Sequence, residues 1–232
     1  MGSDKQARAA AISTNQESWQ RARRPEQKQQ RQSAIVAAAR TLVDDGGVEH
    51  ATLSAIAKSA GISKANCYRY YESREAILLD VFLQEAQDHT RCVVQALSAH
   101  VGSNDVDATA TIIVRNTVAR PRLLNLVSVL WSVLERNISE ALITDFKRQF
   151  HTLSAEWARI INLVHPKLTQ QQAEVFASCH LMFISSAWQA ANPPPAVAAV
   201  MQRAEFCGSR IEFQPLLQAH TLNLLKGMLA EH

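Results

Sequence analysis

Residues 51–82 of the chain read ATLSAIAKSAGISKANCYRYYESREAILLDVF. Thr52 is a typical helix-capping residue, and the apolar residues after it have helical spacing until Gly61, which predicts a helix of about two turns. Ser63 suits the cap of a further short helix that begins at Lys64. Two short helices joined by a tight turn containing glycine form the helix-turn-helix pattern, whose second helix enters the major groove of DNA.

The outward face of this second helix has side chains that suit DNA. If Cys67 points inward, a rotation of about 100° per residue places Tyr71 on the same side and Ala65 and Arg69 on the other. Asparagine can read adenine, arginine and lysine can read guanine, and hydroxyl groups can bond phosphates. The alternative, that these are ordinary surface residues, is disfavoured because they occur together with two short helices and a basic helix before them.

A longer amphipathic helix is expected upstream. Its apolar residues recur at helical spacing from Ile35 to Val43, Pro25 can start it, and Gly46 and Gly47 can end it, which gives roughly twenty residues. A basic run lies at and before its start, comprising Arg21, Arg23, Arg24, Lys28 and Arg31. Taken alone, such a run is more often a solvated arm than a binding surface, and residues 1–24 are expected to form a flexible basic arm.

The composition of the 232-residue chain indicates an all-α protein. Hydrophobic residues make up 47% and aromatic residues only 6%, and the low content of glycine and proline argues against many short strands. The net charge of +3 is unevenly distributed. Residues 1–74 hold 12 Lys and Arg against 7 Asp and Glu, a balance of +5, and residues 75–232 hold 12 against 14, a balance of −2. The positive charge therefore lies at the end with the helix-turn-helix pattern.

Other patterns exclude several classes of protein. The four cysteines, Cys67, Cys92, Cys179 and Cys207, lack the spacing of a zinc site, so we expect reduced thiols and no metal or cofactor. No apolar run is long enough to span a membrane and no secretory leader is evident, which places the protein in a bacterial-type cytoplasm. Motifs of hydrolases, metalloproteases and phosphate loops are absent from the sequence, so no enzymatic activity is expected.

Residues 30–85 closely resemble the DNA-binding domain of the TetR family of transcriptional repressors. The match rests on Thr52, on Gly61-Ile62-Ser63-Lys64 at the turn, on the tyrosines from Tyr68 to Tyr71, and on the helix start at Ser73-Arg74-Glu75. The resemblance implies base reading by Lys64, Ala65, Asn66 and Arg69. It implies phosphate contacts by Thr52, Ser63, Tyr68, Tyr70 and Arg74.

Three positions depart from the family pattern. Cys67 replaces a usual leucine and Tyr71 a usual phenylalanine, and both should be tolerated as inward-facing residues. Arg74 replaces a usual lysine, which keeps the charge but changes its geometry. Oxidation of Cys67 could unseat the recognition helix, although a buried inert thiol is the alternative that we favour.

The rest of the chain is expected to be a second, larger helical region. Ser73 caps a long helix that runs toward His100, and further helices are predicted at 105–119, 121–136, 139–164, 168–191, 196–203 and 214–230. We therefore predict a helix-turn-helix domain over residues 25–74, joined by the long helix to an effector-binding and dimerisation domain over 75–232. By resemblance, the last two long helices would pair with their copies in a homodimer.

Aromatic residues spread over four of these helices could line a cavity for a small effector that is largely apolar or aromatic. The candidates are Trp131, Phe146, Phe150, Trp157, Phe176, His180 and Phe183. The alternative for each aromatic residue is a packed core. His180 could instead form an interface hydrogen bond or be a satisfied interior group.

These features together predict a homodimeric, ligand-responsive repressor that binds a pseudo-palindromic operator in double-stranded DNA. An activator with the same fold is one alternative. A helical small-molecule-binding protein or enzyme whose basic end is incidental is the alternative from another class.

Overall fold

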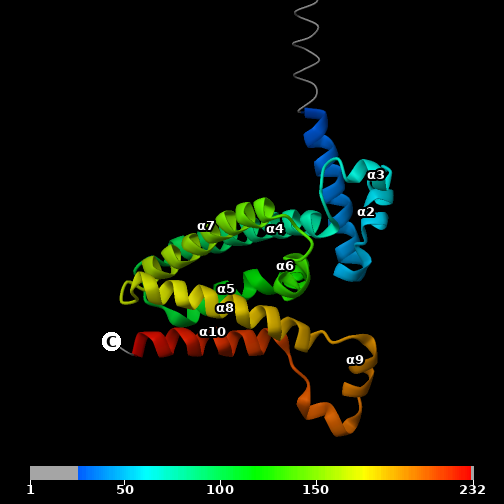
Figure 1. Ribbon diagram of the computed structural model, residues 1–232. Coiled ribbons are helices and arrows are strands. Elements are labelled where there is room, and N and C mark those ends of the chain that lie inside the picture. The colour runs from blue at the N-terminus through cyan, green and yellow to red at the C-terminus, as the bar shows by residue number, and fades with distance from the viewer. Residues whose placement is uncertain (1–25, 231–232) are drawn as a thin grey trace, which may run out of the picture.

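The computed structural model describes residues 26–230 and confirms the all-α fold, since no strand occurs within that range. The first helix, 26–46, leads into a short 3-10 turn, η1 (Val48–His50), and then α2 (Leu53–Ser59) and α3 (Lys64–Cys67). Figure 1 shows these elements as a small head at one end of α4 (Arg74–Leu97). The body comprises η2 (Ser98–His100), α5 (Val106–Val118), α6 (Pro121–Ser128), η3 (Leu130–Leu134), α7 (Glu140–Val164), α8 (Gln170–Ala191), α9 (Pro195–Met201), η4 (Ala204–Ser209) and α10 (Phe213–Ala230).

The predicted helix starts are confirmed by their capping hydrogen bonds. The side-chain oxygens of Thr52, Ser63 and Ser73 accept hydrogen bonds from the backbone amides of Ala55, Asn66 and Ala76, respectively. Each cap satisfies an amide group that the first helical turn leaves without a partner. The local sequence therefore sets where α2, α3 and α4 begin.

The turn between α2 and α3 depends on Gly61. Its φ of 68° lies in the left-handed region, which a side chain disfavours. The amide of Gly61 donates to the carbonyl of Lys58, and the amide of Ile62 donates to that of Ala57. This pair of bonds is a Schellman motif, which ends α2 and turns the chain toward α3.

One apolar core runs through the head and into the body, and α4 connects the two parts. Ile35 and Ile56 from the head are fully buried, as are Ile77 and Leu78 at the start of α4. The same cluster continues to Leu124 of α6. The head is therefore packed against the body rather than joined to it by a loose linker.

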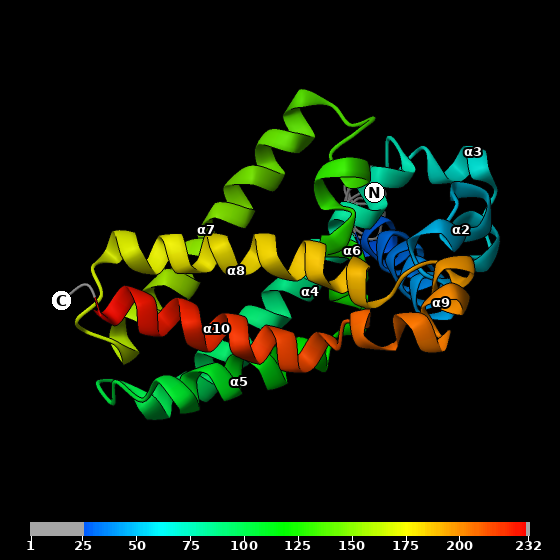
Figure 2. The same ribbon diagram turned by 90° about the horizontal axis from the view of Figure 1, so that it is seen from below.

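The body is a bundle in which α7 packs against both α4 and α8, and α10 packs against α5 and α8. Seen from below, α8 and α10 lie side by side along one face of the molecule (Figure 2). A second apolar cluster, which includes Ile113, Ile161 and Leu225, fills the end of the bundle away from the head. The predicted body helices are thus confirmed to within a few residues, with one exception.

The exception is the helix expected over residues 121–136. Helix α6 ends at Ser128, and the chain then forms a π-helical turn, η3. Trp131 lies in this turn with 43% of its surface exposed, so it does not project from the buried face of α6. Trp131, predicted for the effector pocket, therefore lies at the surface, because the regular helix ends before it.

Substitution of Phe146 with alanine tests the packing of α7 on α4. Phe146 is 2% exposed, and its ring centroid lies 6.0 Å from that of Phe82 and 5.8 Å from that of Phe150. We expect Phe146→Ala to lower the free energy of unfolding by about 3–5 kcal/mol in urea titrations, because the buried ring leaves a cavity. Trp131→Ala is the exposed aromatic control, and an equal loss in the two variants would contradict this packing.

Candidate functional site

We call α3 and the turn that follows it, residues 64–71, the recognition element. Its predicted base-reading side chains are exposed to solvent. Lys64, Ala65, Asn66 and Arg69 are all exposed, whereas Cys67 is fully buried. Tyr71 is 9% exposed and packs inward with Cys67, as the helical spacing predicted. The structure therefore brings the four residues together on one accessible surface, and their reading of bases stays a prediction.

The predicted phosphate contacts surround this surface. Thr52 and Ser63 are exposed, and each hydroxyl oxygen already accepts the capping bond of its helix. A hydroxyl that accepts one hydrogen bond can still donate its own proton to a phosphate oxygen. Tyr68 is 53% exposed, and Tyr70 is partly exposed beside it.

Arg74 differs from the other predicted phosphate contacts, because its guanidinium group is engaged inside the head. Its Nε donates to the carbonyl of Ala51 at 2.8 Å and its Nη2 to that of Val48 at 2.5 Å. Its Nη1 also lies 3.5 Å from a carboxylate oxygen of Glu75. In this structure Arg74 braces the segment before α2, and its contact with phosphate stays a prediction.

A basic groove runs between the first helix and the recognition element. It has a volume of about 1030 Å³, and its lining residues include Lys28, Arg31, Arg69 and Tyr70. No acidic residue lines it among the described residues. Part of the basic run identified in the sequence therefore shares one surface with the recognition residues, while Arg21, Arg23 and Arg24 lie outside the described residues.

Cys67 lies in a position that does not favour redox chemistry. It is fully buried, and this burial raises the pKa of its thiol. The thiolate is the reactive form, so a raised pKa and an inaccessible sulfur both disfavour oxidation. Its contacts support the interpretation of Cys67 as an apolar core residue of the head.

A chain of polar contacts connects the end of the recognition element to α4 and to the first helix. The hydroxyl group of Tyr71 donates to Asp80 at 2.5 Å, and Gln84 donates to the other oxygen of Asp80 at 2.7 Å. Arg40 of the first helix then donates to the side-chain oxygen of Gln84 at 3.0 Å. The hydroxyl group that distinguishes Tyr71 from phenylalanine is thus used to tie the recognition element to α4.

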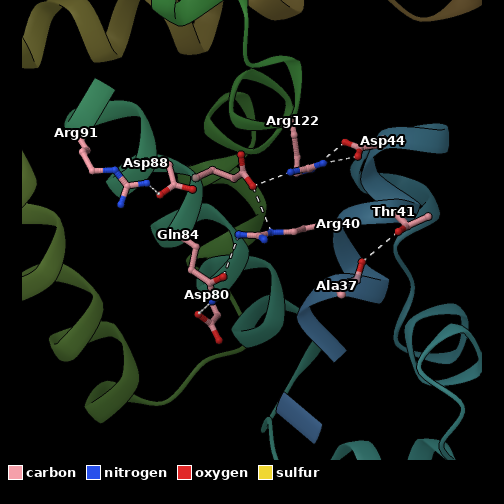
Figure 3. Close-up of polar contacts among 10 residues, drawn as sticks. Ala37, Arg40, Thr41, Asp44, Asp80, Gln84, Asp88, Arg91 and Arg122 are labelled. Atoms are coloured by element: carbon pink, nitrogen blue, oxygen red, sulfur yellow. Dashed lines mark hydrogen bonds and ion pairs between the residues drawn. The ribbon is translucent and has the colours of Figure 1, made fainter. Parts of the chain in front are cut away.

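Arg122, in the first turn of α6, is where head and body meet (Figure 3). Its guanidinium group makes a two-pronged contact with Asp44 of the first helix and donates to Glu85 of α4 at 2.7 Å. Arg40 lies 3.3 Å from the same Glu85 carboxylate. The hydrogen bond with Asp44, followed by that with Glu85, raises the pKa of Arg122 despite its partial burial. One cation therefore joins three helices.

Next to this junction, a cavity of about 170 Å³ lies between α4, α6, α7 and α8, and it opens to solvent beside the exposed Ser178 and Met182. No charged side chain is present among the described residues that line it. The lining residues are Phe82, Ala86, His89 and Thr90 of α4, Leu123 and Val127 of α6, Phe150, Leu153, Ser154 and Trp157 of α7, and Ala177, Ser178, His180, Leu181, Met182 and Ile184 of α8.

Only part of the predicted effector pocket coincides with this cavity. Phe150, Trp157 and His180 line it. Phe146 and Phe176 do not, because both are packed in the core with 2% and 0% exposure. Phe183 points instead to α10, where its ring stacks on His220 at a centroid distance of 3.7 Å. The structure thus places Phe146, Phe176 and Phe183, like Trp131, outside the lining of this cavity.

The sequence patterns did not indicate that residues of α4 and α6 line the cavity. His89 and Thr90 are polar residues that fall within the apolar stripe of α4. This interruption of the stripe is the one sequence feature that could have pointed to a cavity beside α4. Their contacts are internal, since His89 Nε2 pairs with Thr117 at 3.2 Å and Thr90 accepts from Trp157 Nε1 at 3.1 Å. Leu123 and Val127 carried no signal, because leucine and valine suit any buried face.

The two histidines of the cavity are neutral near physiological pH. Burial lowers the pKa of both His89 and His180 to about 3. Arg120 and His180 add to the effect on His89, and His220 adds to that on His180. The ring of His180 stacks on those of Trp157 and Phe176, with centroid distances of 5.7 and 5.9 Å, respectively.

The fold and the head surface define a helix-turn-helix DNA-binding protein with a separate helical body. Residues 35–81 match the bacterial regulatory proteins of the tetR family, and residues 83–232 match the tetracyclin repressor-like C-terminal domain. The chain belongs to the TetR family of transcriptional regulators. Members of this family are DNA-binding regulators rather than enzymes.

Several solved structures share the fold of this chain at low sequence identity. FadR of Thermus thermophilus, solved with lauroyl-CoA, has a TM-score of 0.57 and 19% identity, with 85% of this chain and 95% of that chain covered. RolR, solved with resorcinol, has a TM-score of 0.56 and 15% identity, with coverages of 89% and 93%. FadR of Bacillus halodurans, a fatty acid degradation regulator, has a TM-score of 0.54 and 14% identity, with coverages of 85% and 96%. The search of curated proteins finds no match.

Neither a membrane-spanning helix nor a metal-ion cluster occurs in the described part of the chain. No helix there is both long and apolar enough to cross a bilayer. Residues 26–230 also contain no group of three His, Cys, Asp or Glu side chains placed to hold a metal ion.

The pKa of His180 predicts how stability depends on pH. Its pKa of about 3 in the folded chain lies below the ordinary 6.5, so the unfolded chain takes up the proton first and stability falls as pH drops from 6.5 toward 3. Between pH 6 and 4.5, we expect the free energy of unfolding of His180→Leu to fall less steeply than that of the unmodified chain, by about 1.4 kcal/mol per pH unit. Urea unfolding at fixed protein concentration measures both slopes. The exposed His151→Leu is the control. Parallel curves for His180→Leu and the unmodified chain would contradict a neutral buried His180.

Proposed function

We propose that this protein is a homodimeric repressor that binds a pseudo-palindromic operator and releases it when a small effector occupies the cavity of the body. The protein would act in the cytoplasm, where each head would place its recognition element in one of two successive major grooves of promoter DNA. The observation that carries the proposal is the shared surface of Lys64, Asn66 and Arg69 with the basic groove beside it.

The chemistry of the head supports sequence-specific binding. Arg69 and Lys64 can each pair with guanine, and Asn66 can form two hydrogen bonds with adenine. Lys28 and Arg31 lie along the groove where they can approach phosphates, and each neutralised phosphate releases a counterion. Both kinds of contact are needed, because base contacts select a site and phosphate contacts position the head on it.

The surface formed by α8 and α10 supports a homodimer. Glu174 is the single residue of α8 with a formal charge, and Lys226 is the single one of α10. Val175 and Met182 of α8 are 45% and 60% exposed, and Leu216 of α10 is 39% exposed. A long face that is depleted of charge and exposes large apolar side chains is typical of a protein interface.

The position of α6 supports control of the head by a ligand. Leu123 and Val127 of α6 line the cavity, and Arg122 on the same helix holds Asp44 of the head. A ligand that shifts α6 would change the contact with Asp44 and therefore the placement of the head. Such a ligand acts only to the extent that it binds the two conformations with different affinity.

The nature of the effector is supported by both the cavity and a related structure. The lining is mostly apolar, and RolR, named above, was solved with resorcinol. We therefore propose a largely apolar or aromatic effector. An activator of the same fold would use the same contacts, and it would be distinguished by lower expression of the regulated gene when the protein is deleted.

Substitution of two base-reading residues tests the proposed DNA contacts. We expect Asn66→Ala with Arg69→Ala to reduce the preference for the protein's own promoter over random DNA by about 30-fold or more, since each bidentate contact contributes roughly 1–3 kcal/mol. Fluorescence anisotropy with labelled duplexes measures both affinities.

Two controls accompany this experiment. Arg148→Ala removes an equally positive side chain on α7, 75% exposed, and should leave DNA binding unchanged. Lys28→Ala should weaken binding to all sequences and lower the slope of affinity against salt by about one. Retention of promoter preference by the double variant would refute the assignment of the recognition surface.

A further inference from the structure

His180 is the one polar side chain in the cavity lining whose hydrogen-bonding groups are all buried and unpaired within residues 26–230. Its side chain is 3% exposed, and neither ring nitrogen has a partner there. The nearby polar side chains are already engaged, because His89 pairs with Thr117, Thr90 with Trp157 and Ser154 with the carbonyl of Phe150. Folded proteins pair nearly all buried polar groups, so an unpaired imidazole on a cavity wall points to a ligand.

The surroundings of His180 fix the orientation of its ring. Trp157 and Phe176 stack on it with interplanar angles of 27° and 19°. A stacked neighbour lies over a face of the ring and does not bond its nitrogens, so both nitrogens at the ring edge stay free to bond a ligand. Burial lowers the pKa of His180, so the ring is a neutral imidazole with one donor and one acceptor.

The size and polarity of the cavity restrict what it can hold. Its volume of about 170 Å³ is close to the roughly 150 Å³ of an apolar protein cavity that binds benzene. Such a space fits a single ring with small substituents and is too small for a long acyl chain. No charged side chain lines it within the described residues, so an ionised ligand would lose its hydration without a counter-charge.

We propose that the cavity binds an uncharged, single-ring aromatic molecule whose hydroxyl group forms a hydrogen bond with His180. The apolar lining, including Phe150 and Leu123, would contact the ring of the ligand, and His180 would select the hydroxyl group. The assignment of this cavity as the effector site rests on the proposed function. The inference adds the class of molecule to which the regulator responds.

Three probes of similar size test this ligand class on the full-length protein. Phenol has the ring and the hydroxyl group, toluene replaces the hydroxyl with a methyl group, and benzoate carries a charge. Calorimetric or ligand-observed NMR titration should show phenol binding about tenfold more tightly than toluene, and benzoate most weakly. Equal affinity for phenol and toluene, tighter binding of benzoate, or no binding of phenol at millimolar concentration would each overturn the proposal.

Substitution of His180 tests whether this side chain causes the preference for phenol over toluene. His180→Leu should bind toluene but lose the tenfold preference for phenol, and the matched His151→Leu, on the exposed face of α7, should keep it. A preference for phenol that survives in His180→Leu would refute the role of His180. Should His180→Leu fail to fold, the probe series on the unmodified chain still decides the ligand class.

Operator binding separates this inference from the proposed function. If phenol binds with the predicted preference but never weakens operator binding, the ligand class stands and the regulatory role of the cavity fails. If operator binding is released by a charged or larger molecule and phenol does not bind, the regulatory function stands and the ligand class fails.

Discussion

The burial of α4 is the constraint on which the rest of the structure depends. Its first turns pack under the head, where Ile77 and Leu78 are fully buried, and its later turns enter the body, where Val93 and Leu97 are fully buried. One helix thus completes two parts of the protein, and neither part can move far without disturbing the packing of the other. At the surface of the same junction, Arg122 adds a polar connection by contacting both Asp44 and Glu85.

This arrangement gives a physical basis for communication between a ligand and DNA. The cavity shares walls with α4 and α6, the helices that also form hydrogen bonds with the first helix of the head through Gln84 and Arg122. Interiors packed at native density do not deform continuously, so a molecule placed between these helices favours one of a few discrete arrangements. The polar chain from Tyr71 through Asp80 and Gln84 to Arg40 extends the connection to the end of the recognition element.

Much of the head could be predicted from sequence because its signals are local. The caps at Thr52, Ser63 and Ser73 and the glycine at the turn act through neighbouring residues, so their helices began where expected. The cavity could be predicted only in part. Phe146, Phe176 and Phe183 have the same apolar character as Phe150, and which of them faces a void depends on contacts between distant helices. Likewise, nothing near Arg74 in sequence indicates that its guanidinium binds the carbonyl groups of Val48 and Ala51.

In the proposed homodimer, the packing of each head against its body through α4 would fix how the two heads meet DNA. Selection of bound sequences from random DNA by the full-length protein tests it most directly. We expect enrichment of one two-fold symmetric site whose half-sites lie at a single spacing, about 34–36 Å or a multiple of it between centres. Enrichment of isolated half-sites, of half-sites at variable spacing, or of no sequence at all would contradict it.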